Sequence, residues 1–135
     1  MPRELSNSYN ERDFNPPAPI VDVLLTTPDP ELFEQFVPIK KMALLDTGAD
    51  MTAIPSSLVN ELELKKIDEI IVTDYQGNLL RTSIFVIRVM LDELLDLNIR
   101  VITSDLDYVH IGRDIMNKWK LYLNGLNKVL KIELD

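Results

Sequence analysis

The chain has 135 residues, contains no cysteine, and carries a formal net charge of −8. Its length suits one domain with its own core but hardly two, and the absence of cysteine excludes disulfides, thiolate metal sites and a thiol nucleophile. The negative charge argues against binding to nucleic acid or to anionic membrane surfaces, since both need a basic face.

The compartment is suggested by what the chain does not contain. No apolar run approaches the length of a membrane span, and the first residues are polar and include proline, so we expect neither a transmembrane helix nor a signal peptide. A chain without cysteine also fits a reducing environment. We therefore predict a cytoplasmic protein.

The single histidine limits the available chemistry. Zinc sites built from three histidines or from an HExxH motif are excluded. His110 lies between Val109 and Ile111, which predicts a strand residue with its ring at the surface or in a hydrogen-bonded position. A catalyst in this chain would have to work mainly with carboxylates.

The first part of the chain is predicted to hold a tail and two strands. Residues 1–17 are rich in polar residues and proline and show no regular hydrophobic period, which favours a flexible tail or an arm that orders only against a partner. The folded domain would cover residues 18–135. Residues 20–27 and 37–45 are apolar and rich in β-branched side chains, as expected of strands. Prolines between them mark a turn.

The rest of the chain is predicted to be mostly β. Ser56 and Ser57 can cap a short helix with Leu58 and Leu62 on one face. The remaining expected elements are strands at residues 67–73, 79–91, 97–103 and 108–111, a short helix at 113–118 with Ile115, Met116 and Trp119 facing a core, and a terminal hairpin of residues 119–123 and 129–134. Hairpins without βαβ units or repeats predict a closed or nearly closed β structure.

One stretch, ALLDTGAD at residues 43–50, ends an apolar strand in an acid, a hydroxyl residue and a glycine. Asp and Gly are ordinary turn residues. Two carboxylates held about 3 Å apart, however, keep one proton between them, so that one can act as base and the other as acid. No second Asp-Thr-Gly or Asp-Ser-Gly occurs, and Asp50 does not obviously face Asp46. If Asp46 is catalytic, a two-fold axis that opposes two copies is the simplest solution, which predicts a homodimer.

This stretch, together with IGRDIM at residues 111–116, resembles the retropepsins, the retroviral-type aspartic proteases with cellular and prokaryotic relatives. The resemblance covers roughly residues 20–134. It implies a retropepsin-like closed β-barrel, the acid protease fold, with one lobe per chain. It also implies an obligate homodimer that hydrolyses peptide bonds with an activated water and needs no metal or organic cofactor.

The resemblance assigns roles to the residues of the first motif. Asp46 would be the catalytic aspartate. Thr47 would send its hydroxyl across the dimer axis to the partner's active-site loop. Gly48 would let the loop backbone approach the pair of carboxylates and donate hydrogen bonds.

Four further residues receive roles by the same resemblance. Ala49 would keep the substrate channel narrow, and Asp50 would contact the substrate backbone and pair with Arg113. Gly112 would allow the packed turn into the following helix. Arg113 at a solvated helix end and Asp50 as a turn cap are the plainer alternatives.

In this family a hairpin between the two motifs forms a flap over the substrate, which here corresponds to roughly residues 70–84. Its tip would hold Tyr75, Gln76 and Gly77 as substrate-binding residues, with Gly77 permitting the tip to move. This tip has one glycine where viral flaps tend to have more, and a plain exposed turn aromatic is an equal alternative for Tyr75.

The leading hypothesis is therefore a homodimeric aspartic endopeptidase acting on peptides or proteins. The main rival is a catalytically weak or inactive module of the same fold, used for peptide binding or dimerisation. A third option is a coincidental motif in an unrelated β-barrel binding protein, which would be a monomer.

Overall fold

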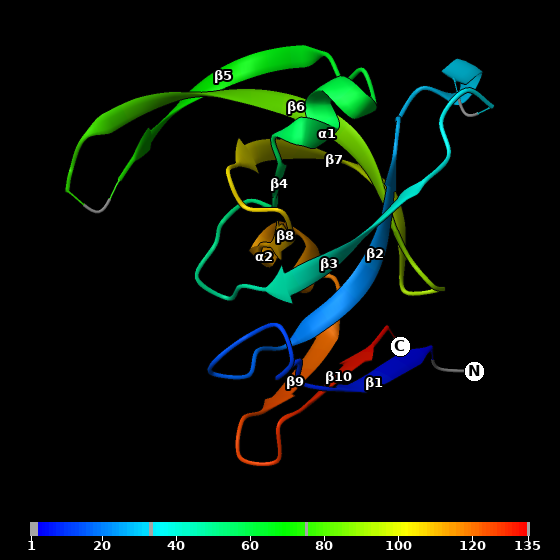
Figure 1. The fold of residues 1–135 in the computed structure, drawn as a ribbon, viewed down its shortest axis with the longest axis vertical. Helices are drawn as coiled ribbons and strands as arrows, with labels where there is room; N and C mark the ends of the chain where they lie inside the picture. The colour runs from blue at the N-terminus through cyan, green and yellow to red at the C-terminus, as the bar shows by residue number, and fades with distance from the viewer. Residues whose placement is uncertain (1–2, 33, 75, 135) are drawn as a thin grey trace.

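The structure is a computed structural model that describes residues 3–32, 34–74 and 76–134 (Figure 1). Its elements are β1 (Glu4–Ser8), β2 (Ile20–Thr26), the 3₁₀ turn η1 (Pro30–Leu32), β3 (Ile39–Leu45), β4 (Ala53–Pro55), α1 (Ser57–Glu61), β5 (Lys66–Thr73), β6 (Leu79–Leu91), β7 (Leu95–Ser104), β8 (Val109–Ile111), α2 (Arg113–Met116), β9 (Lys120–Asn124) and β10 (Val129–Glu133). Among the described residues, no helix is both long and apolar enough to cross a membrane.

A closed barrel forms the body of the protein. Its strands run in the order β2, β3, β8, β4, β7 and β6, and a further antiparallel pairing of β6 with β2, through pairs such as Leu25 with Val89, closes the ring of six. Among the described residues, β5 pairs with β6 alone and extends the sheet beyond the ring. The predicted fold class, a mainly β closed barrel with two short helices in one lobe, is confirmed.

The barrel interior is filled by alternate residues of its strands. In β2, Val21, Val23 and Leu25 are buried while Asp22 is exposed, as expected for side chains that point alternately to the two faces of a strand. A second sheet, β1-β10-β9, packs Leu130 and Ile132 into the same core. The predicted helix residues Ile115, Met116 and Trp119 are also buried.

The β5–β6 hairpin reaches away from the barrel and arches to one side of it (Figure 1). Apolar side chains remain exposed along it, among them Ile71, Leu79 and Leu80. Gly77 has φ +83° at the tip, a conformation that favours glycine. A predicted hairpin around Gly77 is therefore present. Tyr75 lies outside the described residues.

Over residues 1–17 the sequence predicts a flexible tail, or an arm that orders only against a partner; in the structure Glu4–Ser8 form β1. β1 pairs antiparallel with β10, with Leu5 opposite Ile132. Asn10 and Ala18 then form an isolated bridge. This segment has too few apolar side chains for its sequence to predict a strand. It is a strand because its backbone groups form hydrogen bonds with β10, at the other end of the chain.

The helices are shorter than expected, and one expected cap is absent. Ser56 occupies the N-cap position of α1 but its side chain makes no capping hydrogen bond. Leu58 and Leu62 are nevertheless buried on one face, as predicted. α2 ends at Met116, and the indole N–H of Trp119 then donates to the carbonyl oxygen of Leu94 at 3.0 Å.

Candidate active site

The turn after β3 presents Asp46 at an edge of the barrel. The backbone N–H of Asp46 donates to the carbonyl oxygen of Ile111 at 2.9 Å, continuing the parallel pairing of β3 with β8. Ala49 N–H donates to the carbonyl oxygen of Asp46 at 3.1 Å and closes the turn. Gly48 N–H donates to Oδ1 of Asp46 at 3.0 Å. The Asp46 carboxylate is therefore held by its own loop and is partly open to solvent.

Gly48 keeps the space beside this carboxylate free. A Cβ atom at Gly48 would lie 3.4 Å from Oδ1 of Asp46. Thr47 is exposed, and its hydroxyl forms no hydrogen bond within the described part of the chain. The Thr47 side chain is thus open to solvent in the single chain.

His110 contacts Asp46, which the sequence alone did not predict. Its Nδ1 lies 3.3 Å from Oδ2 of Asp46, and its ring stacks on Tyr108 with the centroids 5.1 Å apart. Nε2 is buried and has no hydrogen-bond partner among the described residues. The expectation of a surface or hydrogen-bonded ring therefore holds for Nδ1 only. The parallel register that pairs His110 with Leu44 brings the ring to Asp46.

The second motif anchors the loop that follows Asp46. Asp114 accepts the backbone N–H of Thr52 through Oδ2 at 3.0 Å and the Thr52 hydroxyl through Oδ1 at 2.8 Å. The Thr52 hydroxyl also accepts the backbone N–H of Gly112 at 3.2 Å. Thr52 is fully buried. Sequence reasoning missed Thr52, which lies outside both motifs, and gave no role to Asp114, although it belongs to the second motif.

Arg113 and Gly112 also contact the loop that follows Asp46. The Arg113 guanidinium pairs with Oδ1 of Asp50 and donates to the carbonyl oxygen of Thr47 at 3.4 Å. The backbone N–H of Arg113 donates to the carbonyl oxygen of Ala49 at 2.9 Å. A Cβ at Gly112 would lie 2.7 Å from the carbonyl carbon of Met51, so only glycine fits this contact without a shift. The expected pairing of Asp50 with Arg113 is thus present.

A groove of about 790 Å³ separates this loop from the β5–β6 hairpin. Four residues of the predicted site line it: Asp46, Gly48, Ala49 and Asp50. β5 supplies the opposite wall, residues 70–73, and Ile102 and Met51 add apolar surface. Gln76, Gly77 and Thr47 do not line the groove in the single chain. The space suits an extended polymer that passes between the hairpin and the Asp46 turn.

Asp74 organises the tip of the hairpin. Its Oδ1 accepts the backbone N–H groups of Asn78 at 2.8 Å and Gln76 at 2.9 Å, and its Oδ2 accepts the Asn78 side-chain amide at 3.2 Å. These donors, the Asn78 N–H first, hold the pKa of Asp74 below its usual value of 3.8. The tip is thus ordered by a carboxylate in addition to the glycine.

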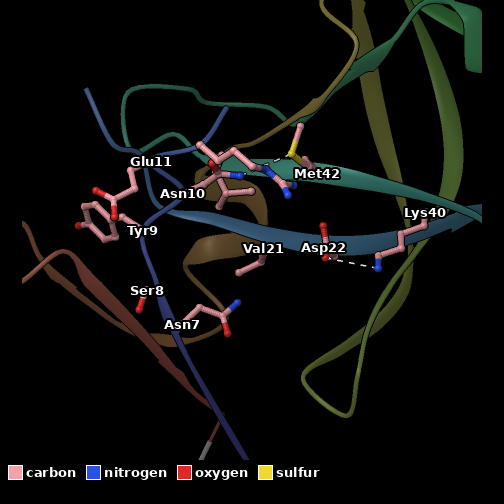
Figure 2. Close-up of a pocket in the computed structure, with 11 residues that line it drawn as sticks. Asn7, Ser8, Tyr9, Asn10, Glu11, Val21, Asp22, Lys40 and Met42 are labelled. Atoms are coloured by element: carbon pink, nitrogen blue, oxygen red, sulfur yellow. Dashed lines mark hydrogen bonds and ion pairs between the residues drawn. The ribbon is translucent and has the colours of Figure 1, made fainter. Parts of the chain in front are cut away.

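A second hollow, of about 590 Å³, lies beside the N-terminal segment and strands β2 and β3 (Figure 2). Its lining is mostly polar, and Lys40 Nζ lies 3.5 Å from Oδ2 of Asp22 within it. No residue of the predicted site lines this hollow. In the part of the chain that the structure describes, no cluster of three or more acidic or histidine side chains could hold a metal ion. The groove beside Asp46 is therefore the candidate active site.

Comparison with known families agrees with this geometry. The family described as retroviral aspartyl protease matches residues 17–124, which is most of the chain. The chain belongs to this family. The matched residues include the Asp46 turn and the loop before α2. A search of curated protein sequences found no match.

Two solved retropepsin-type structures are similar in fold. A retropepsin-like aspartic protease from Rickettsia conorii is 17% identical, with a TM-score of 0.62, and the alignment covers 98% of this chain and 92% of that one. EIAV protease, solved with the inhibitor HBY-793, is 20% identical, with a TM-score of 0.53 and coverage of 82% and 92%. At these identities the likeness establishes the retropepsin fold alone.

Proposed function

We propose that two copies of this chain form an aspartic endopeptidase whose active site contains both Asp46 carboxylates. The observation that carries the proposal is the placement of one Asp-Thr-Gly turn, with its carboxylate held by Gly48 N–H, on the floor of a groove in a single lobe. One carboxylate of this kind is a weak base at neutral pH. A two-fold axis supplies the second one without any further sequence.

The chemistry follows from a shared proton. The ionised Asp46 of the pair takes a proton from a water as the water attacks the scissile carbonyl carbon, while the protonated Asp46 donates to the carbonyl oxygen. Collapse of the tetrahedral intermediate transfers a proton to the leaving amine. Within each protomer, Gly48 N–H stabilises the negative charge on Oδ1 throughout this cycle.

The groove supports an extended peptide as substrate. Its walls combine carboxylates at Asp46 and Asp50 with apolar surface from Met51, Ile70 and Ile102. Edges of β5 and of the Asp46 loop offer backbone groups, so that a peptide can be bound mainly through its main chain. The Asp50–Arg113 pair holds one rim of this groove in place.

Replacement of Asp46 tests the proposal. Denatured casein is incubated with the purified chain from pH 3 to pH 8, with and without a statine-type inhibitor, and with Asp46→Asn as the matched variant. We expect cleavage that the inhibitor blocks and that Asp46→Asn abolishes while dimer content by sedimentation is unchanged. Cleavage retained in a clean Asp46→Asn preparation contradicts the mechanism. A folded dimer that never cleaves and still binds peptide supports the inactive-module alternative instead.

A further inference from the structure

His110 lies against the carboxylate that the proposed function makes catalytic. Its Nδ1 is 3.3 Å from Oδ2 of Asp46, while Gly48 N–H holds Oδ1 at 3.0 Å. Both oxygens of Asp46 are therefore contacted from within one protomer. An ionised carboxylate can only accept hydrogen bonds, so the proton of the histidine contact resides on Nδ1.

The other ring nitrogen indicates which form of the imidazole fits this site. Nε2 of His110 is buried and lacks a hydrogen-bond partner among the described residues. In a neutral ring with its proton on Nδ1, Nε2 is a bare acceptor. A second proton there would bury an N–H donor without an acceptor, which costs free energy. The site thus suits a ring that donates one hydrogen bond, from Nδ1 to Asp46.

Packing fixes the direction of the ring. His110 pairs with Leu44 of β3 on one side and with Ala53 of β4 on the other, so its backbone is held by two strands. Its ring stacks on Tyr108 with an interplanar angle of 21°, and Phe14 packs edge-on against Tyr108 with centroids 5.1 Å apart. This arrangement aims Nδ1 at Asp46.

The charged groups on the neighbouring segments have other partners. Arg113 pairs with Asp50 on the outside of the loop, and Asp114 accepts hydrogen bonds from Thr52. In the described part of the chain, two ionisable groups contact the His110 ring: Asp46, at Nδ1, and Tyr108, through stacking.

We propose that His110 is a positioning residue for the active-site aspartate, a role that rests on the proposed function. The imidazole donates from Nδ1 to Oδ2 and fixes the orientation of the carboxylate. The contact therefore holds Oδ2 in place for the proton transfers of the proposed reaction, so its loss should lower kcat and leave KM unchanged.

Three substitutions separate the hydrogen bond from mere packing. In His110→Asn the side-chain amide nitrogen takes the place of Nδ1 and can donate to Asp46. In His110→Gln the amide lies near the place of Nε2 and does not face Asp46. His110→Leu fills the site without a donor. Thermal unfolding and sedimentation first establish that each variant is a folded dimer.

The kcat and KM of casein cleavage are then measured for each protein. We expect the Asn variant to keep the wild-type kcat, and the Gln and Leu variants to lose kcat by up to about a hundredfold at an unchanged KM, because the reacting carboxylate is no longer held in place. Equal kcat in all four proteins, or an Asn variant as slow as the Leu variant, would overturn the proposal.

A second readout does not depend on cleavage. Because His110 is the only histidine in the sequence, a ¹⁵N-histidine-labelled sample shows one imidazole, and its nitrogen shifts report which nitrogen carries the proton. We expect the Nδ1–H tautomer in both proteins, because Nε2 is buried without an acceptor, and a more slowly exchanging Nδ1 proton in the wild type than in Asp46→Ala, where the acceptor is gone. An Nδ1 proton that exchanges equally fast in both proteins, while the wild type cleaves casein, would overturn the role of His110 alone. A protected Nδ1 proton in a wild type that never cleaves would overturn the endopeptidase, and the catalytic consequence with it.

Discussion

Thr52 and Asp114, 62 residues apart in the sequence, are joined through both oxygens of the carboxylate. The contact ties the loop after Asp46 to the start of α2. Thr52 is fully buried and its hydroxyl also accepts Gly112 N–H, whereas Asp114 is exposed, so this contact joins the core to the surface. The two sequence motifs of the family are thus connected by a residue that belongs to neither short pattern.

Thr52→Val removes this hydroxyl and keeps the shape of the side chain. We expect the free energy of unfolding to fall by about 1–3 kcal/mol, because Asp114 and Gly112 N–H each lose a partner. Urea denaturation measures the change. Thr52→Ser is the control, since it keeps the hydroxyl and loses one methyl group, at about 1 kcal/mol. A Val variant at least as stable as the Ser variant would show that the hydroxyl contributes nothing.

Gly112→Ala tests the close approach of the two loops. The added methyl group would lie 2.7 Å from the carbonyl carbon and 2.8 Å from the carbonyl oxygen of Met51, so backbone must move. We expect a loss of about 1–3 kcal/mol in unfolding free energy, the range for overpacking, and reduced cleavage as the Asp46 loop shifts. Gly125→Ala is the matched control, because a Cβ there meets nothing within 4 Å. Equal stability of the two variants contradicts the packing argument.

Thr47→Ala is expected to weaken the proposed dimer and leave the protomer intact. Thr47 is exposed in the single chain, so its hydroxyl is free to bind across a two-fold axis. Loss of one hydrogen bond from each protomer, at about 1 kcal/mol each, corresponds to at least a tenfold rise in the dimer dissociation constant. Sedimentation equilibrium measures it, with Thr47→Ser as the variant that retains the hydroxyl. An Ala variant with an unchanged constant would remove Thr47 from the interface.

Asp74→Ala is expected to loosen the hairpin tip without unfolding the barrel. Amide hydrogen exchange should be less protected at Gln76 and Asn78, whose N–H groups lose their acceptor. Asp105→Ala, in the exposed loop before β8, is the control. Unchanged protection at Asn78 would show that Asp74 does not hold the turn.

The stabilisation of the hairpin tip by Asp74 is expected to depend on pH. The pKa of Asp74 is lower in the folded chain than its ordinary 3.8, so the stabilisation is fully present above that value and is lost as the pH falls through the lowered pKa. Protection factors of the wild-type tip should therefore approach those of Asp74→Ala in strong acid only. Convergence near neutral pH would contradict the assignment.

Most strands of the barrel could be predicted because their sequences show the apolar runs or the alternation of apolar and polar residues that are typical of strands. β2 alternates buried and exposed residues, β6 is apolar over most of its length, and β7 alternates apolar and polar residues from Leu95 to Val101. β1 could not be predicted from the residues ELSNS, because its pairing with β10 is made by backbone groups and a distant partner. β4 was missed because three residues are too few to show a period.

The residues of the candidate site also fall into those that could be predicted from the sequence and those that could not. Asp46, Gly48 and Asp50 were found from residue types in a short pattern, and the structure places them on one groove. His110 was visible as the sole histidine, but its contact with Asp46 depends on the parallel register of β3 and β8, which no local pattern encodes. Thr52 and Asp114 depend on the same long-range placement.

The pairing of β1 with β10 has a consequence for synthesis. Leu5 is made more than a hundred residues before its partner Ile132. At about 5–20 residues per second, β1 therefore stays without β10 for several seconds during translation. The small sheet, and with it the place of Leu130 and Ile132 in the core, can form only after the whole of β10 has been made.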